Sequence, residues 1–276
     1  QGRLVVAAAT GTNPYKYGMI GSTDTHTALS TTAENNFFGK TANTEPRPGR
    51  DVGFEKRNKE LGIKRFAWQT AASGVVAVWA RENTRGEIFD AMQRKETYAT
   101  TGPRIRVRFF GGYDFTEEDI RNREPATLGY RKGVPMGGDL GAAPEGKAPT
   151  FLLAAMKDPM SGNLDRIQIV KGWVDAEGQA HEKVYDAVWS DPETRKLDLL
   201  GDLPAVGNTV DAKTATWMNS IGDGELISVW EDPDFDPSLK AFYYARVLEI
   251  TRSEEGRVGK AGGKRRRRSW YVRLRE

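Results

Sequence analysis

Arg166-Ile-Gln-Ile-Val-Lys-Gly-Trp-Val174 and His181-Glu-Lys-Val-Tyr-Asp-Ala-Val-Trp189 are two stretches rich in β-branched and aromatic residues, joined through Asp175-Ala-Glu-Gly178. Stretches of this composition favour strands, and a short connection that contains Asp and Gly is typical of a hairpin. We therefore predict that the two stretches pair as neighbouring antiparallel strands. This hairpin determines the expected class of the second half of the chain.

Four further stretches around the hairpin are also predicted as strands, and Gly, Pro and Asp turns separate them. Residues 104–109, Arg-Ile-Arg-Val-Arg-Phe, alternate charged and apolar side chains with period two, as a half-exposed antiparallel strand does. The other predicted strands are residues 150–156, 225–230 and 241–249. We expect residues 104–250 to form a mainly β, sandwich-like domain.

The first 103 residues alternate strand-like and helix-like segments, so we predict an α/β arrangement there. Tyr17-Gly-Met-Ile-Gly21 reads as a short strand. Gly74-Val-Val-Ala-Val-Trp-Ala80 is a continuous apolar run of the kind that is buried in parallel sheets. Between them, residues 35–53 predict an irregular loop and residues 55–61 a short helix.

A helix is predicted over residues 85–95. Thr84-Arg-Gly-Glu87 has the spacing of a capping box, in which the Thr hydroxyl and the Glu carboxylate cap backbone N–H groups at the helix start. Ile88, Phe89 and Met92 lie at i, i+1 and i+4, and we expect them to form one buried face. Emptying a buried Phe89 site would cost about 3–5 kcal/mol.

The composition excludes several classes of protein. There is no cysteine, and His26 and His181 are the two histidines of the chain. Disulfides, thiolate metal sites and cysteine nucleophiles are therefore excluded, and a metal site would need carboxylates or further residues. The apolar run of residues 4–9 is much shorter than the roughly 20 residues of a membrane span. We predict a soluble protein without a membrane span, and both periplasm and cytoplasm stay open.

The net charge of +3 has its origin at the end of the chain. Residues 251–276 contain ten Lys and Arg against three Glu, whereas the first 250 residues carry 31 basic and 35 acidic side chains. We predict a disordered basic tail over residues 251–276 and no nucleic-acid partner. Residues 252–260 resemble translated adapter sequence, which would make the tail non-native. A nucleic-acid binder that uses this tail is the rival interpretation, and its binding would weaken steeply with salt.

The segment Gly21-Ser-Thr-Asp-Thr-His26 carries a carboxylate and an imidazole two residues apart at the end of a predicted strand. Residues i and i+2 of an extended segment project to one side, so the two groups are placed to share a metal ion. A hydrogen bond within the loop is the other interpretation of this pattern.

A longer series of motifs resembles a known family. The Gly21–His26 segment is similar to the Gly-Ser-Asp-x-His loop that closes the metal site of phosphoesterases of the polymerase and histidinol phosphatase (PHP) type, with Thr23 as an extra residue. The chain as a whole, over residues 1 to about 250, resembles the bacterial family catalogued as domain of unknown function 3604, which is related to the PHP and amidohydrolase group. The motifs that carry this resemblance occur in order at residues 17–26, 36–40, 71–80, 87–92, 98–103, 133–139, 163–173, 181–185 and 242–250.

The resemblance implies a function and a site. Asp24 and His26 would be metal ligands and catalytic residues that hold a divalent ion, Zn, Mn or Fe, in a cluster present only in the full-length protein. Residues 1–103 would be the C-terminal part of a distorted PHP-like α/β barrel, and the remaining ligands would come from a preceding part of the same protein. The substrate would be a small phosphoester, ester or amide, and the chain alone would be an inactive fragment.

Three cationic residues are weaker candidates for holding an anionic substrate. Arg104 follows the Thr101-Gly-Pro103 turn, and guanidinium groups bind phosphate and carboxylate in a bidentate manner. Lys40 and Arg47 lie in the loop region after the proposed metal loop. Solvated surface positions are the alternative for all three, and His181 is expected to be structural. The rival function is a non-catalytic β-sandwich module that binds carbohydrate or protein.

Overall fold

The computed structural model describes residues 2–13, 16–28, 40–42, 53–54, 65–66, 74–211, 214 and 216–252. Within these ranges the protein is mainly β, as predicted for the second half, and every pair of neighbouring strands is antiparallel. No sheet of the described residues closes into a barrel. The described residues therefore do not support the prediction that residues 1–103 are part of a distorted α/β barrel.

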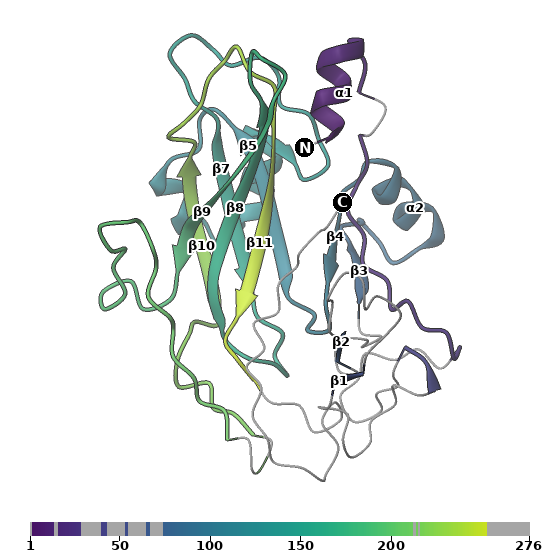
Figure 1. The fold of residues 1–276 in the computed structure, drawn as a ribbon, viewed down its shortest axis with the longest axis vertical. Coiled ribbons are helices and arrows are strands. Elements are labelled where there is room, and N and C mark those ends of the chain that lie inside the picture. Colours follow the sequence, from purple (N-terminus) through teal and green to yellow (C-terminus); the bar gives the residue numbers. More distant parts are fainter. Residues whose placement is uncertain are drawn as a thin grey trace.

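Two sheets form the centre of the molecule, with strand orders β10-β7-β5-β6 and β11-β8-β9 (Figure 1). Their strands are β5 (Arg106–Gly112), β6 (Val134–Pro135), β7 (Thr150–Met156), β8 (Leu164–Val174), β9 (Ala180–Trp189), β10 (Glu225–Glu231) and β11 (Ala241–Glu249). The predicted hairpin is confirmed, because β8 and β9 pair antiparallel. Gly178 adopts a φ of +80° in its turn, a conformation that favours glycine.

The two sheets pack face to face over a shared hydrophobic core. Alternate residues of each strand point to the same face, so one apolar set per strand reaches this core. Its buried members are Phe151, Leu153, Ala155, Leu164, Ile167, Ile169 and Leu226. Ile105 and Phe109, two apolar positions of the alternating stretch 104–109, pack against this core.

Helices cover the outer face of the four-stranded sheet. The 3-10 helix η5 (Glu117–Arg121) leads into α3 (Pro125–Lys132), whose Leu128 packs on Phe110 and Leu152. A methyl group added at Gly129 would overlap the Phe110 ring, so glycine allows the helix to approach the sheet closely. The second hydrophobic cluster thus fixes α3 on the face opposite to the shared core.

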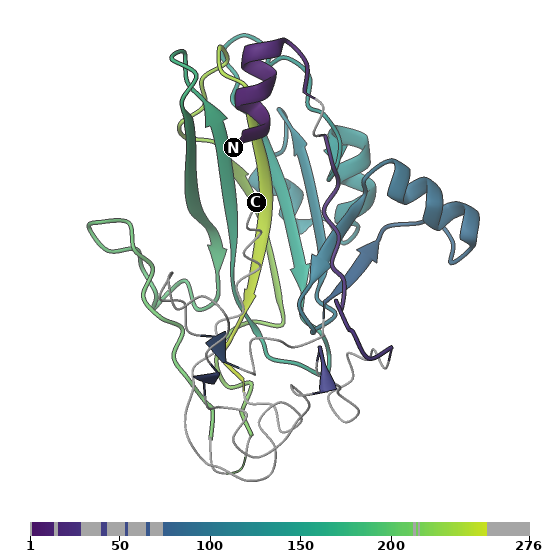
Figure 2. The ribbon, with the colours of Figure 1, turned by 45° about the vertical axis from the view of Figure 1, so that its right-hand side comes forward.

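Helix α1 (Gly2–Thr10) contacts β8 and β9 of the three-stranded sheet. Leu4 and Ala7 of the apolar run noted in the sequence are buried there, and they lie on one side of this short helix. Figure 2 shows α1 lying along the upper part of this sheet. Among the described residues, none of the helices has the length and apolar composition of a membrane span.

A smaller unit lies beside the sandwich and consists of β3 (Val75–Val78), α2 (Arg85–Gln93) and β4 (Thr97–Thr100) (Figure 2). The expectation of a buried strand in a parallel sheet was wrong for residues 74–80. β3 pairs antiparallel with β4, and all four of its residues are half-buried. An apolar run of four residues satisfies either arrangement, which is why periodicity alone misassigned it.

The start of α2 agrees with the prediction, whereas its buried face does not. The Thr84 hydroxyl accepts a hydrogen bond from the Glu87 N–H at 3.4 Å, and the helix begins at the next residue. Phe89 and Met92 are 58% and 42% exposed, and the buried position is Ala91. Ile88 is half-buried, so of the three side chains that we expected inside, Phe89 and Met92 are exposed, and the helix packs through the small Ala91.

Polar and aromatic contacts join this unit to the sandwich. The Trp79 indole N–H donates to the Val107 carbonyl at 2.8 Å, and the Arg108 guanidinium lies 3.3 Å from the centre of the same indole. The Tyr130 hydroxyl donates to the carboxylate of Glu96, which is 3% exposed. Burial of these groups with their partners satisfies their polar atoms and fixes the unit against β5 and α3.

Other predictions fall on less regular parts. The strand expected at residues 17–21 is absent, and Ile20 is 60% exposed. Short strands β1 (Gly53–Phe54) and β2 (Arg65–Phe66) pair with each other, but most of the predicted loop 35–53 and helix 55–61 lie outside the described residues. Arg252, within the predicted tail, pairs with the buried Glu249. Residues 253–276 lie outside the described residues.

Candidate functional site

The Gly21–His26 segment begins against the edge of β3. A methyl group added at Gly21 would overlap the Val75 carbonyl oxygen, and one added at Gly74 would overlap the Ser22 carbonyl oxygen. Two glycines on separate segments therefore allow the two backbones to touch. This contact fixes the point from which the segment carrying Asp24 and His26 departs.

Local hydrogen bonds then shape the loop. The hydroxyls of Ser22, Thr23 and Thr25 each accept a bond from the N–H two residues further on, at 3.4–3.5 Å. Ser and Thr make such turns readily because the hydroxyl mimics a backbone acceptor. Asp24 has a φ of 51°, a left-handed conformation that Asp tolerates better than most residues. The loop is thus bent, not extended as we expected.

Asp24 and His26 nevertheless lie together. The His26 Nε2 atom is 3.4 Å from the Asp24 Oδ1 atom, and both side chains are more than half exposed. The other carboxylate oxygen of Asp24 accepts a hydrogen bond from the Lys40 ammonium group. The Lys40 ammonium, and next to it the His26 imidazole, lower the pKa of the Asp24 carboxyl, so this group is ionised at neutral pH.

Lys40, a weaker candidate in the sequence, is part of the same constellation. Its carbonyl oxygen accepts a hydrogen bond from the His26 N–H at 2.7 Å, so backbone and side chain both fix it to the loop. Arg104 is elsewhere: its N–H donates to Asp158 at 2.7 Å and its side chain is exposed. Arg47 lies outside the described residues.

The donor set for a metal ion consists of one carboxylate and one imidazole. Among the described residues, no group of three or more His, Cys, Asp or Glu side chains is close enough to hold an ion. A zinc or similar site uses at least three protein ligands plus an open position. The described part of the chain thus offers two of the ligands, with the Lys40 cation beside them.

The structure also contains a polar cluster that we did not predict. Lys171 on β8 is 4% exposed, and its ammonium group donates to Asp232 Oδ2 at 2.6 Å. The Tyr243 hydroxyl on β11 donates to the same oxygen at 2.6 Å. Burial, and next to it the Asp232 charge, raise the pKa of the Tyr243 phenol. Inside the sandwich these groups satisfy one another's hydrogen-bonding capacity, so the cluster has a structural role. The signal for it in the sequence was a Lys at an inward-facing strand position.

His181 occupies the hairpin end of the sandwich, far from Asp24 in sequence. Its Nε2 atom is 2.6 Å from Asp175 Oδ2, and its ring stacks on Trp173 with a centroid distance of 5.2 Å. The imidazole closes the β8–β9 turn, which is consistent with the structural role expected for it.

Comparison with known proteins places the chain in a family. Residues 2–256 match the family described as a protein of unknown function, DUF3604, and the chain belongs to it. No curated protein and no solved structure is significantly similar to the chain. Membership thus confirms the family resemblance of the sequence and leaves the activity to be argued from the site.

Proposed function

We propose that this protein is part of a metal-dependent hydrolase of the PHP type, and that Asp24 and His26 are two of its metal ligands. The observation that carries the proposal is the distance of 3.4 Å between Asp24 Oδ1 and His26 Nε2. Two ligand atoms bound at about 2.1 Å to one tetrahedral ion lie about 3.4 Å apart. The distance between the two atoms therefore matches that between two ligands of one ion.

The surrounding residues support this use of the loop. The Asp24 carboxyl is ionised at neutral pH, which is the form that binds a cation, although the Lys40 ammonium beside it opposes the charge of a metal ion. Lys40 also offers a positive charge next to the pair, where the anionic group of a substrate would lie. A divalent ion, when bound, supplies Lewis acidity and lowers the pKa of a coordinated water. The substrate class is a phosphoester or a carboxylic ester or amide.

The remaining ligands would come from residues that precede those described, in a longer protein of which this chain is the C-terminal part. One feature of the described residues supports this completion. The unit β3–α2–β4 leaves Phe89, Met92 and all of β3 partly exposed, which is apolar surface suited to a further layer.

The test compares this chain with the protein that includes the upstream reading frame. Both are assayed with Zn²⁺ or Mn²⁺ on a p-nitrophenyl phosphodiester and on p-nitrophenyl acetate, in parallel with elemental analysis. We expect turnover and stoichiometric metal in the longer protein only. Asp24→Ala and His26→Ala should abolish both there, because each removes a ligand.

His181→Ala is the matched control, since it removes the other histidine of the chain without touching the loop. It should leave metal content and turnover unchanged. Full turnover after His26→Ala would exclude the proposed role of the loop. If the longer protein instead binds an oligosaccharide or a protein independently of metal and hydrolyses nothing, the binding-module function replaces this proposal.

A further inference from the structure

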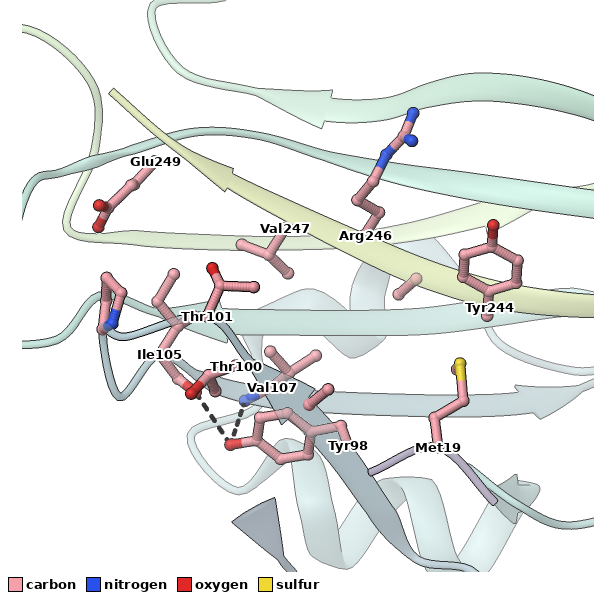
Figure 3. Close-up of a pocket in the computed structure, with 13 residues that line it drawn as sticks. Met19, Tyr98, Thr100, Thr101, Ile105, Val107, Tyr244, Arg246, Val247 and Glu249 are labelled. Carbon is pink, nitrogen blue, oxygen red and sulfur yellow. Dashed lines mark hydrogen bonds between the residues drawn. The ribbon is translucent and has the colours of Figure 1, made fainter. Parts of the chain in front are cut away.

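A pocket of about 70 Å³ lies where β4 and the start of β5 face β11. Figure 3 shows Tyr98, Ile105 and Val107 on one side and Val247 on the other, with Met19 near one end. The lining is mostly apolar, and the pocket is partly open to solvent. It is separate from the donor atoms of Asp24 and His26, which do not line it.

One polar side chain of this lining has no partner. Thr100 is 7% exposed, and among the described residues its hydroxyl is a buried polar atom without a hydrogen bond. More than nine in ten buried polar groups in proteins are hydrogen-bonded, so such an orphan calls for an explanation. By contrast, the Tyr98 hydroxyl is fully used, since it donates to the Ile105 carbonyl and accepts from the Val107 N–H.

The charged groups around the pocket are already engaged. Glu249 pairs with Arg252 and accepts a hydrogen bond from the Ser161 hydroxyl at 2.8 Å. The Arg246 Nε–H donates to the Gln168 side chain at 2.8 Å, and in Figure 3 the guanidinium extends from β11 away from Tyr98. An ion in the pocket would therefore meet apolar walls without a free counter-charge, which is unfavourable.

We propose that this pocket binds a small, neutral, oxygen-containing aliphatic group, the alcohol, ether or ester end of a ligand, whose oxygen bonds the Thr100 hydroxyl. The size agrees with this class. A cavity of about 150 Å³ accommodates benzene, so about 70 Å³ suits three or four non-hydrogen atoms. A hydroxyl both donates and accepts, and therefore serves either an alcohol or a carbonyl oxygen.

Met19, which lines the pocket, precedes the Gly21–His26 segment by two residues in the chain. The binding itself does not depend on hydrolysis or on metal. It can therefore be tested on the chain as it is.

The experiment is an NMR titration of the ¹⁵N-labelled protein with 2-propanol and with acetate, which have equal numbers of non-hydrogen atoms and differ in charge. We expect saturable shifts of the Thr100, Thr101 and Val247 amides with 2-propanol, at millimolar affinity for so small a probe. Acetate should give none. Ala99→Leu, which fills the pocket from β4, should abolish the response.

Thr100→Val removes the hydroxyl and keeps the shape, so the affinity for 2-propanol should fall about threefold to tenfold. Its melting temperature should rise, because an unpaired buried hydroxyl is lost. Thr150→Val is the matched control: Thr150 is equally buried, but its hydroxyl accepts a bond from the Phe115 N–H. That variant should melt lower and bind 2-propanol normally. The proposal is overturned by unchanged affinity in Thr100→Val, by equal binding of acetate, or by no saturable response.

Discussion

At the scale of single residues, exposure separates positions that the sequence makes look alike. Phe89 on α2 and Phe110 on β5 are both aromatic residues within regular elements, yet they are 58% and 1% exposed. A periodic pattern identifies an apolar face but not the partner that covers it. Truncation of Phe89 should therefore cost much less stability than truncation of Phe110, although the pattern of α2 predicts a buried Phe89.

We predict that Phe89→Ala lowers the free energy of unfolding by less than about 1 kcal/mol, and Phe110→Ala by about 3–5 kcal/mol. The reason is that Phe110 fills a closed site against Gly129 and Leu128, whereas Phe89 already contacts water. Urea unfolding of both variants measures this difference. A cost of 3 kcal/mol or more at Phe89 would show that its ring is covered in solution.

A second residue-scale prediction concerns the glycine contact that positions the proposed metal loop. Gly74→Ala should destabilise the protein by about 1–3 kcal/mol, because the added methyl overlaps the Ser22 carbonyl oxygen and forces the two backbones apart. Gly86→Ala is the control: it lies in the first turn of α2 with no atom within 4 Å of the added methyl, and should be neutral or stabilising. Equal melting temperatures for the two variants would contradict the contact.

At the scale of elements, a partly buried ion pair that joins two neighbouring elements should contribute more stability than an exposed ion pair. Lys132 at the end of α3 donates to both carboxylate oxygens of Asp119 in η5, at 2.7 and 2.8 Å. Asp119 also accepts from the Thr116 N–H at 2.8 Å. Burial raises the pKa of the Asp119 carboxyl, but the bonds from Lys132 and Thr116 outweigh it, and the net pKa lies below the ordinary 3.8.

A group whose folded pKa is depressed contributes stability above its unfolded pKa and loses it as the pH falls through the folded value. Asp119→Asn should therefore cost about 1–3 kcal/mol at pH 7, and the cost should shrink as the pH falls below 3.8. Asp114→Asn, at an exposed pair with Lys147, should cost less than about 1 kcal/mol. Urea unfolding at pH 7 and pH 3 is the measurement. A pH-independent cost at Asp119 would mean that its charge contributes nothing.

Element prediction succeeded where the local signal was unambiguous. The Asp175–Gly178 turn and the Thr84 cap depend on a few neighbouring residues, and both have the expected role. The parallel sheet predicted for residues 74–80 was wrong, because the antiparallel partner of β3, β4, is chosen by packing on the sandwich through contacts such as Trp79 with Val107. Such long-range contacts have no signature in a single sequence.

At the scale of the whole molecule, the candidate site lies at the edge of the smaller unit and not in the sandwich. The spacing of Asp24 and His26 predicted that they would meet, although the bent loop that brings them together and the role of Lys40 as their neighbour came from the structure. Sequence could not give that role, because it depends on a backbone contact between residues 26 and 40. The central claim is that this loop is a cation site.

The most direct test is a Zn²⁺ titration of this chain by calorimetry, with three single variants. A site with two ligands should bind weakly in the unaltered chain. Lys40→Gln removes a positive charge next to Asp24, so we expect several-fold tighter binding at low salt. His26→Ala should lose the binding, and His181→Ala should retain it. Binding that survives His26→Ala, or that weakens in Lys40→Gln, would contradict the assignment of Asp24 and His26 as metal ligands.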